Sequence, residues 1–160
     1  MIDGKIRAGS AGRAGEFGLA PYHGGGTLEG RISGSAIRAH HATLGGSGNP
    51  EDAFREAADG EPIGEQVIHA FIDDLAWAAS ALTSALDPEV FVLGGGIGLQ
   101  CKPYLDILHD RVERAVGFAP SFFVTQLGDD AGLTGAGTVA LEAARSVEPW
   151  LKGGVLQTTS

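Results

Sequence analysis

The sequence has a single cysteine, Cys101, among its 160 residues. One cysteine can neither close an internal disulfide nor build a thiolate metal site, so we expect Cys101 to be a small buried hydrophobe. The chain also has no apolar run long enough to span a bilayer, and its first residues lack the apolar core of a signal peptide. These absences predict a cytoplasmic protein that does not contact a membrane.

Basic residues are scarce as well. Eleven Lys and Arg residues stand against twenty Asp and Glu residues, which leaves a formal net charge of -9. A nucleic-acid-binding surface needs clustered Lys and Arg to neutralise phosphates, and the basic residues here are scattered. We therefore expect no nucleic-acid binding by this chain. Its length and a hydrophobic content of 43% suffice for one compact domain with a buried core.

Glycine, in contrast, is abundant, and one glycine cluster follows a predicted strand. Residues 89–93 are apolar at nearly every position, as in a parallel sheet covered on both faces. Gly94, Gly95 and Gly96 come directly after this strand. Such a turn is either a plain tight connection or a place where the backbone approaches a phosphate or nucleoside closely. We favour the approach of a ligand.

The other periodic segments are predicted helices and one further strand. The predicted helices cover residues 33–41, 49–58, 62–86, 103–116 and 129–146, and the predicted strand covers residues 121–127. The helix over 62–86 carries a single apolar stripe, which we expect to pack on the sheet. The alternation of helices and strands with short links predicts an α/β domain with parallel strand pairing.

Four stretches, in this order and spacing, resemble segments of the ROK family of sugar kinases and sugar-responsive repressors. They are residues 2–6, like the hairpin after the family's second phosphate loop; 14–18, like its Ala-Gly-Glu-aliphatic-Gly-His segment; 87–97, like its adenosine-binding strand and turn; and 129–136, like its closing helix motif. The resemblance implies an actin-like (ribonuclease H-like) ATPase lobe of the α/β class, with a short mixed sheet covered by helices.

The same resemblance implies the site residues. Glu16 and Glu29 correspond to sugar contacts, a role that suits carboxylates because each accepts two hydroxyl hydrogen bonds. The alternative is that both are solvated loop acids. Gly94, Gly95 and Gly96 correspond to the adenosine contact, which implies ATP as the cofactor, with Mg²⁺ in a complete enzyme. A Gly95→Val change is expected to abolish ATP binding and to leave the fold intact.

The chain departs from the family pattern at its metal site. Leu19 stands where the family has a histidine that contacts zinc and sugar, and Thr27 stands where the last zinc cysteine would be. The loop between them offers only His23, whereas a structural zinc needs four nitrogen or sulfur ligands. We therefore expect no zinc. The lost histidine points to a different substrate, an altered site or a decayed one.

The resemblance covers only the family's C-terminal lobe. We assign residues 1–150 to this lobe and residues 151–160 to a flexible tail. The family's first phosphate loop and its general-base aspartate lie upstream of the point where Met1 falls, and residues 1–7 read as a hairpin that begins in mid-element. Since phosphoryl transfer depends on positioning and charge stabilisation by such groups, we expect a chain that lacks the N-terminal lobe and is inactive alone.

Three functions are compatible with these sequence features. The first is the nucleotide- and sugar-binding lobe of an ATP-dependent, glucokinase-like enzyme that phosphorylates a hexose hydroxyl. The second is the sugar-sensing lobe of a ROK-type repressor, and the third is a non-catalytic dimerisation remnant. The intact glycine turn favours the first. Family members pair through this lobe, so we also expect a homodimer, in which association covers apolar surface.

Overall fold

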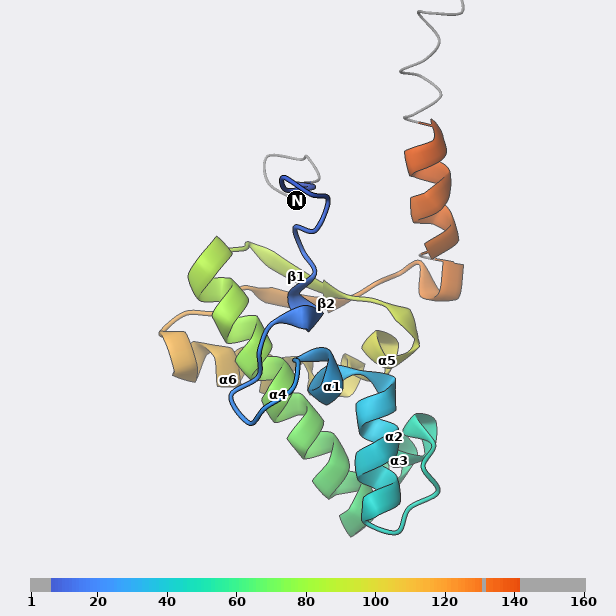
Figure 1. Ribbon diagram of the computed structural model, residues 1–160. Coiled ribbons are helices and arrows are strands. Elements are labelled where there is room, and N and C mark those ends of the chain that lie inside the picture. Colours follow the sequence, from blue (N-terminus) through green and yellow to red (C-terminus); the bar gives the residue numbers. More distant parts are fainter. Residues whose placement is uncertain (1–6, 131, 142–160) are drawn as a thin grey trace, which may run out of the picture.

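The computed structural model describes residues 7–130 and 132–141. Its centre is the long helix α4, Pro62–Leu86, which crosses the molecule in Figure 1. Helices α2 (Gly34–Thr43) and α3 (Pro50–Ala58) pack against one side of α4, and α6 (Leu105–Val116) packs against another. The helices therefore form a layer on both flanks of one central helix.

Shorter elements connect these helices to two strands. They are η1 (Phe17–Leu19), α1 (Glu29–Ile32), β1 (Val90–Leu93), α5 (Gly95–Gln100), η2 (Lys102–Tyr104), β2 (Ser121–Val124) and η3 (Gly128–Asp130). Residues 132–141 form one more helix, whose side chains are exposed. None of the helices in the described residues is both long enough and apolar enough to cross a membrane.

The predicted starts of α2 and α3 are confirmed by their caps. The Ser33 hydroxyl accepts a hydrogen bond from the backbone N–H of Ala36 at 3.2 Å. At α3, the Asn49 side-chain oxygen accepts from the N–H of Glu51 at 3.3 Å, and Pro50 occupies the first helical position. Each cap pairs a backbone donor that the first helical turn leaves without an intrahelical partner.

Helix α4 has the predicted bounds, but it is buried on more than one stripe. It ends where Asp87 adopts a left-handed conformation with φ of 45°, directly before Pro88. Its buried residues are Gly64, Val67, Ile68, Phe71, Ile72, Asp74, Ala76, Ala78, Ala79, Ser80 and Thr83. The burial is wider than the predicted stripe because α2 and α3 cover one flank and α6 covers another.

The two strands pair in parallel, as predicted, and Val92 lies opposite Phe123. On the inner face, the rings of Phe91 and Phe122 stack with centroids 5.2 Å apart and join the core. On the outer face, Val92 and Phe123 are 60% and 55% exposed. The prediction of a strand covered on both faces is therefore wrong for the described residues. The described part of the sheet consists of this parallel pair.

The segment after β1 also differs from prediction. A helix was expected to begin near residue 103, but α5 begins at Gly95, and η2 and α6 follow it. Cys101 lies at the junction of α5 and η2, where it is buried and its thiol donates to the backbone oxygen of Ile97 at 3.3 Å. Cys101 is 1% exposed, which confirms a small buried hydrophobe, and this burial raises the pKa of its thiol to about 12.

Several predictions fall on other parts of the chain. The proposed hairpin over residues 1–7 lies almost wholly outside the described residues, and so do the tail over residues 151–160 and the end of the last predicted helix.

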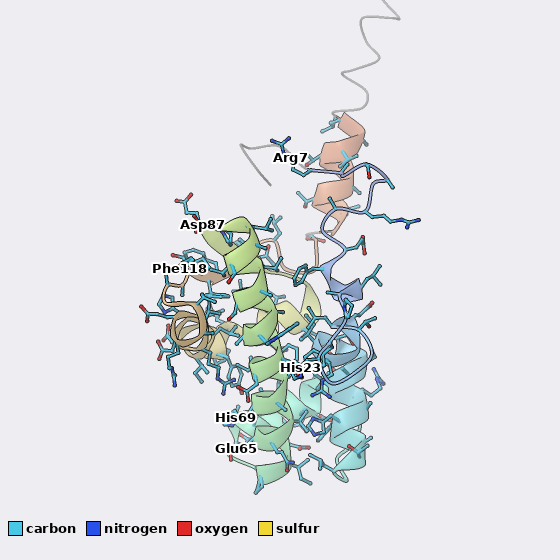
Figure 2. The ribbon with its side chains drawn as sticks, turned by 60° about the vertical axis from the view of Figure 1, so that its left-hand side comes forward. Arg7, His23, Glu65, His69, Asp87 and Phe118 are labelled. Carbon is cyan, nitrogen blue, oxygen red and sulfur yellow. The ribbon has the colours of Figure 1, made fainter. Side chains whose placement is uncertain are left out.

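Figure 2 shows the length of α4, with Asp87 at one end of the helix and Glu65 near the other.

Candidate functional site

The glycine turn after β1 is open to solvent. Gly94 has an extended backbone and precedes the first turn of α5, and Gly95 has φ of 73°, a conformation that favours glycine. A Cβ atom added to Gly95 or Gly96 would meet no atom within 4 Å. Nothing in the packing around Gly96 requires glycine there, so its surface is free for a ligand to approach.

Because Gly95 has a positive φ, the Gly95→Val substitution cannot test ligand contact alone. A β-branched residue is strained in the left-handed region, so this substitution would disturb the turn itself as well as any ligand contact. Gly96 has no positive φ, and a side chain there would enter open space. Gly96 is therefore the better position at which to test ligand contact.

The turn is held in place by two neighbouring segments. The backbone N–H of Thr125 donates to the carbonyl of Leu93 at 2.8 Å, which extends the sheet pairing to the end of β1. Gly98 packs on the same strand end, because a Cβ atom there would lie 3.0 Å from the carbonyl carbon of Leu93. The helix α5 also contacts η3. Two of the four predicted motifs, the glycine turn and the start of the closing motif, thus lie together.

The two predicted sugar-binding acids lie on adjoining elements. Glu16 immediately precedes η1, and Glu29 is the first residue of α1; both are exposed. A Cβ atom on Gly18 of η1 would lie 3.4 Å from the Cβ and 4.0 Å from a carboxylate oxygen of Glu29. The structure therefore packs η1 against the side chain of Glu29.

The loop between the two acids is a tight glycine hairpin. Pro21 and Thr27 form an antiparallel bridge, and the N–H of Tyr22 donates to the carbonyl of Gly26 at 3.1 Å. The ring of His23 lies 4.2 Å from that of Tyr22 and 5.7 Å from that of Trp77. Figure 2 shows His23 beside the middle of α4.

The donor atoms of this hairpin do not suit zinc. It contributes one histidine, and zinc requires four ligands in tetrahedral order. In the described part of the chain, the one group of three His, Cys, Asp or Glu residues with neighbouring ligand atoms is His109, Asp110 and Glu113, on the distant helix α6. The expected absence of zinc remains a prediction that rests on the hairpin sequence.

A buried carboxylate that sequence reasoning missed lies behind the hairpin. The Tyr22 hydroxyl donates to Oδ1 of Asp74, and Nε of Arg31 donates to Oδ2 of the same residue at 2.9 Å. The hydrogen bond to Asp74 raises the pKa of Tyr22. The one sequence signal was an aspartate within the apolar pattern of α4, and neither partner is near it in sequence.

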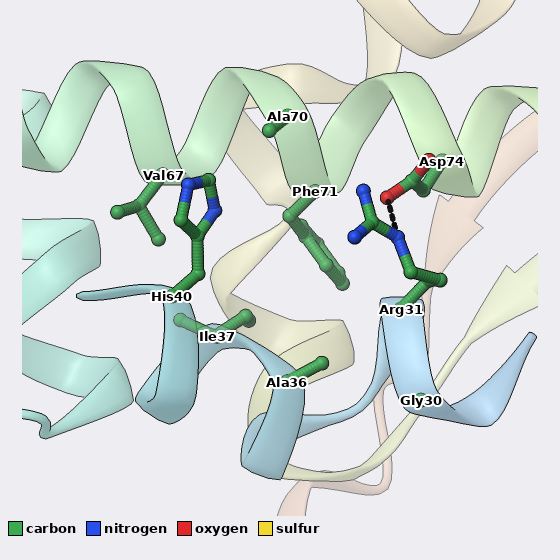
Figure 3. Close-up of a pocket in the computed structure, with 9 residues that line it drawn as sticks. All are labelled: Gly30, Arg31, Ala36, Ile37, His40, Val67, Ala70, Phe71 and Asp74. Atoms are coloured by element: carbon green, nitrogen blue, oxygen red, sulfur yellow. Dashed lines mark hydrogen bonds and ion pairs between the residues drawn. The ribbon is translucent and has the colours of Figure 1, made fainter. Parts of the chain in front are cut away.

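A small cavity adjoins the Arg31–Asp74 pair, between α1, α2 and α4, as Figure 3 shows. It is partly open to solvent, has a volume of about 40 Å³ and is lined by Gly30, Arg31, Ala36, Ile37, His40, Val67, Ala70, Phe71 and Asp74. A space of this size holds a water molecule and is far too small for a sugar. Any sugar site at Glu16 and Glu29 is therefore on the open surface beside η1.

The acid-bearing segment and the glycine turn are linked through α2 and α5. A Cβ atom on Gly34, at the start of α2, would lie 3.4 Å from the side chain of Ile97 in α5. Gly34 follows α1 almost at once, and Ile97 follows Gly96. The predicted nucleotide contact and the predicted sugar contacts therefore belong to adjoining parts of the molecule.

This architecture matches solved structures. A ROK family glucokinase from Streptomyces griseus, in complex with glucose and AMPPNP, aligns with a TM-score of 0.73 at 23% identity, over 84% of this chain and 54% of that one. The fold is accordingly the actin-like fold of the ROK sugar kinases. Residues 1–143 match the ROK family, and the chain belongs to that family.

Curated relatives of the chain are named as kinases. An N-acetylmannosamine kinase from Vibrio cholerae is 34% identical over 133 residues, which cover 77% of this chain and 44% of the relative. A bifunctional enzyme NanE/NanK from Brucella melitensis is 30% identical over 144 residues, which cover 88% of this chain and 28% of the relative. The chain thus spans less than half the length of these two relatives.

Proposed function

We propose that this chain is the nucleotide- and sugar-binding lobe of an ATP-dependent sugar kinase. The observation that carries the proposal is the open turn at Gly94, Gly95 and Gly96. At Gly96 the surrounding atoms leave room for a side chain, so packing does not explain the glycine there. Membership of the ROK family and the kinase names of the relatives support the same function.

The nucleotide lies against the glycine turn in this proposal. The Streptomyces griseus glucokinase was solved with AMPPNP, an ATP analogue, and the present chain shares its fold. Without Cβ atoms, the backbone of Gly95 and Gly96 allows close contact with the adenosine. ATP would enter as its Mg²⁺ complex, in which the metal neutralises phosphate charge. Since ATP is a cytoplasmic substrate, we also propose a cytoplasmic location.

The sugar lies beside η1, where Glu16 and Glu29 accept hydrogen bonds from its hydroxyl groups. Carboxylates on two adjoining elements can fix the orientation of a ring, because each accepts hydrogen bonds in a defined direction. The relatives are named for N-acetylmannosamine and glucose, so a hexose is the proposed substrate class. Leu19, which is 60% exposed in η1, offers an apolar contact where the family resemblance has a histidine.

Phosphoryl transfer itself is proposed to need a second lobe. The reaction depends on groups that position the phosphates and accept the hydroxyl proton, and the resemblance places those groups outside this lobe. The chain spans 44% of the Vibrio cholerae enzyme, in keeping with one lobe of two. We therefore propose that the lobe, residues 1–150, binds ligands but does not turn over alone.

The outer face of the sheet supports association with other protein. Val90, Val92 and Phe123 leave apolar surface on that face. Burial of exposed apolar surface favours association. We propose that two copies of the chain pair as a homodimer. Light scattering at several concentrations tests this: a monomer at all of them contradicts the pairing.

The test of the function combines the two lobes. The chain is co-expressed with the N-terminal lobe of the Vibrio cholerae N-acetylmannosamine kinase, and ADP release is measured over a panel that includes N-acetylmannosamine and glucose. We expect sugar-dependent ADP release from the pair and none from either lobe alone. Calorimetry with AMPPNP on this chain is the second measurement. A chain that neither binds AMPPNP nor supports ADP release would contradict the proposal.

A further inference from the structure

Helix α1, which carries Glu29, cannot hold its own orientation. It spans only the four residues Glu29–Ile32, and no side chain caps its start at Leu28. Isolated helices of this length are unstable, because few hydrogen bonds repay the cost of ordering the chain. Leu28 is 1% exposed and anchors the start of the helix in the interior. The direction in which Glu29 points must be set by further contacts.

Those contacts converge on one carboxylate of α4. Asp74 accepts a hydrogen bond from the Tyr22 hydroxyl through Oδ1 and one from Nε of Arg31 through Oδ2, at 2.9 Å. The guanidinium carbon of Arg31 lies 5.2 Å from the centre of the Tyr22 ring, so the three side chains form a closed set. A hydrogen bond to a charged group is stronger than a neutral one. Water is largely excluded from the Asp74 side chain, which is 9% exposed, whereas the Arg31 side chain is 47% exposed.

The base of this set is rigid. Asp74 lies in the middle of the 25-residue helix α4, and its side chain is only 9% exposed. Trp77, three residues further along α4, packs edge-on against the Tyr22 ring with centroids 5.5 Å apart. The hairpin before α1 is thus attached to α4 at two neighbouring points, and α1 is attached at the same place through Arg31.

Glu29 lies between the two attached residues in the chain. Tyr22 precedes it in the hairpin, and Arg31 follows it within the same short helix, so loss of the Asp74 contacts weakens the attachment on both sides of Glu29 while Leu28 and Trp77 keep theirs. We infer that Asp74 is a positioning residue that fixes α1 so that Glu29 faces η1 and the sugar. The inference rests on the proposed function, because it concerns the same sugar site.

Asp74 acts through Glu29 and does not touch the sugar itself. Its carboxylate is buried behind the hairpin, and the cavity beside it has a volume of only about 40 Å³. Figure 3 shows the Arg31–Asp74 pair at one end of this cavity, where Arg31 reaches from α1 to Asp74 on α4. Both carboxylate oxygens already accept hydrogen bonds and only 9% of the side chain is exposed, so we assign Asp74 no direct contact with the sugar.

The chain offers matched variants for a test. Asp74→Asn keeps the shape of the side chain but removes its charge, and Tyr22→Phe removes one hydroxyl only. Asp73→Asn is the control. Asp73 directly precedes Asp74 in α4, its side chain is 65% exposed, and its Oδ1 lies 2.9 Å from a guanidinium nitrogen of Arg111 in α6. The control removes an aspartate charge from the same helix without a contact to α1.

Two measurements on the chain test the inference. Hydrogen exchange of the amides in residues 28–32 reports the order of α1 without any ligand. Titration with N-acetylmannosamine and with AMPPNP reports the two ligand sites separately. For Asp74→Asn we expect the amide exchange rate in residues 28–32 and the dissociation constant for the sugar each to rise by about tenfold. The affinity for AMPPNP should stay within about twofold of the wild-type value. Tyr22→Phe should give a smaller rise of the same kind, and Asp73→Asn none.

The outcomes separate this inference from the proposed function. If Asp74→Asn and Tyr22→Phe exchange like Asp73→Asn, the inference is overturned, whatever the sugar result. If exchange rises but sugar affinity does not change, Asp74 orders α1 without serving the sugar site, and the inference is also overturned. A wild type that binds no sugar contradicts the proposed function, whereas exchange still decides whether Asp74 fixes α1. Equal losses of sugar and AMPPNP affinity would show a general structural role and overturn the inference.

Discussion

The helical end of the molecule, where α2 and α3 pack on α4, needs two of its glycines, Gly46 and Gly64, for packing, whereas the turn after β1 has a glycine, Gly96, that no neighbouring atom requires. A Cβ atom on Gly64 would lie 2.4 Å from the backbone nitrogen of Ala57, and one on Gly46 would lie 2.0 Å from Nε2 of His41. At Gly96, no atom lies within 4 Å of that position. Gly132, Gly135 and Gly137 are as open as Gly96, but Gly96 belongs to the turn that follows a strand of the sheet, and this place makes it the glycine to examine for a ligand.

The largest expected effect tests the packed side of this comparison. Gly64→Ala places a methyl group against the backbone of α3, and the two helices must move apart to admit it. Overpacking of this kind costs about 3 kcal/mol of unfolding free energy. Urea denaturation followed by circular dichroism measures the loss. Gly96→Ala is the control and should leave the midpoint unchanged; equal losses for both variants would remove the distinction between the two sites.

The second expected effect is a loss of nucleotide affinity, and it tests the exposed glycine turn after β1. Gly96→Val projects a branched side chain into the space proposed for the nucleotide, and we expect AMPPNP affinity to fall by at least about tenfold, or about 1.4 kcal/mol. Calorimetry measures the affinity, and urea denaturation should show an unfolding free energy close to that of the wild type. Full AMPPNP affinity in Gly96→Val would mean that the nucleotide does not contact this turn.

The smallest expected effect is a pH dependence of the unfolding free energy, and it comes from Cys101 at the C-terminal end of α5. The folded pKa of Cys101 is about 12, above the value of about 8.5 for an unfolded thiol. The unfolded chain therefore releases this proton first, and the stability that Cys101 contributes is full below pH 8.5 and falls as pH rises towards 12. Between pH 8 and 9.5 the loss should be about 1 kcal/mol. In Cys101→Ala this part of the slope should disappear, and an unchanged slope would contradict the burial argument.

Local signals in the sequence were enough to predict most of the helices. Ser33 and Asn49 define helix starts through hydrogen bonds to backbone groups two or three residues away, and Asp87-Pro88 ends α4 within the chain itself. The parallel pairing followed from the alternation of elements. Such features depend on neighbours in sequence, and sequence reasoning therefore captured them.

The features that sequence reasoning missed depend on distant contacts. Helix α5 was not expected because glycines disfavour helices, but packing of Gly98 on Leu93 and of Ile97 on Gly34 holds it. The exposed outer face of the sheet could not be read from apolar residues alone. Asp74 lies 52 residues from Tyr22 and 43 from Arg31, so no local pattern marks it as the support of α1. The site acids were named by family resemblance, and the glycine turn by the strand and glycines in sequence as well as by resemblance; the roles of both stay predictions.

Helix α4 separates, along the chain, the two segments that carry the proposed sites. The hairpin, α1 and their acids come from residues 16–32, before α4, and the strands and glycine turn come from residues 90–124, after it. The first segment contains Leu19 and Thr27, where the family resemblance predicts a histidine and a cysteine, and the second contains Gly94, Gly95 and Gly96. In the proposed enzyme, the sugar contacts and the nucleotide contact therefore come from separate segments of the chain, so each can be substituted without changing the sequence of the other.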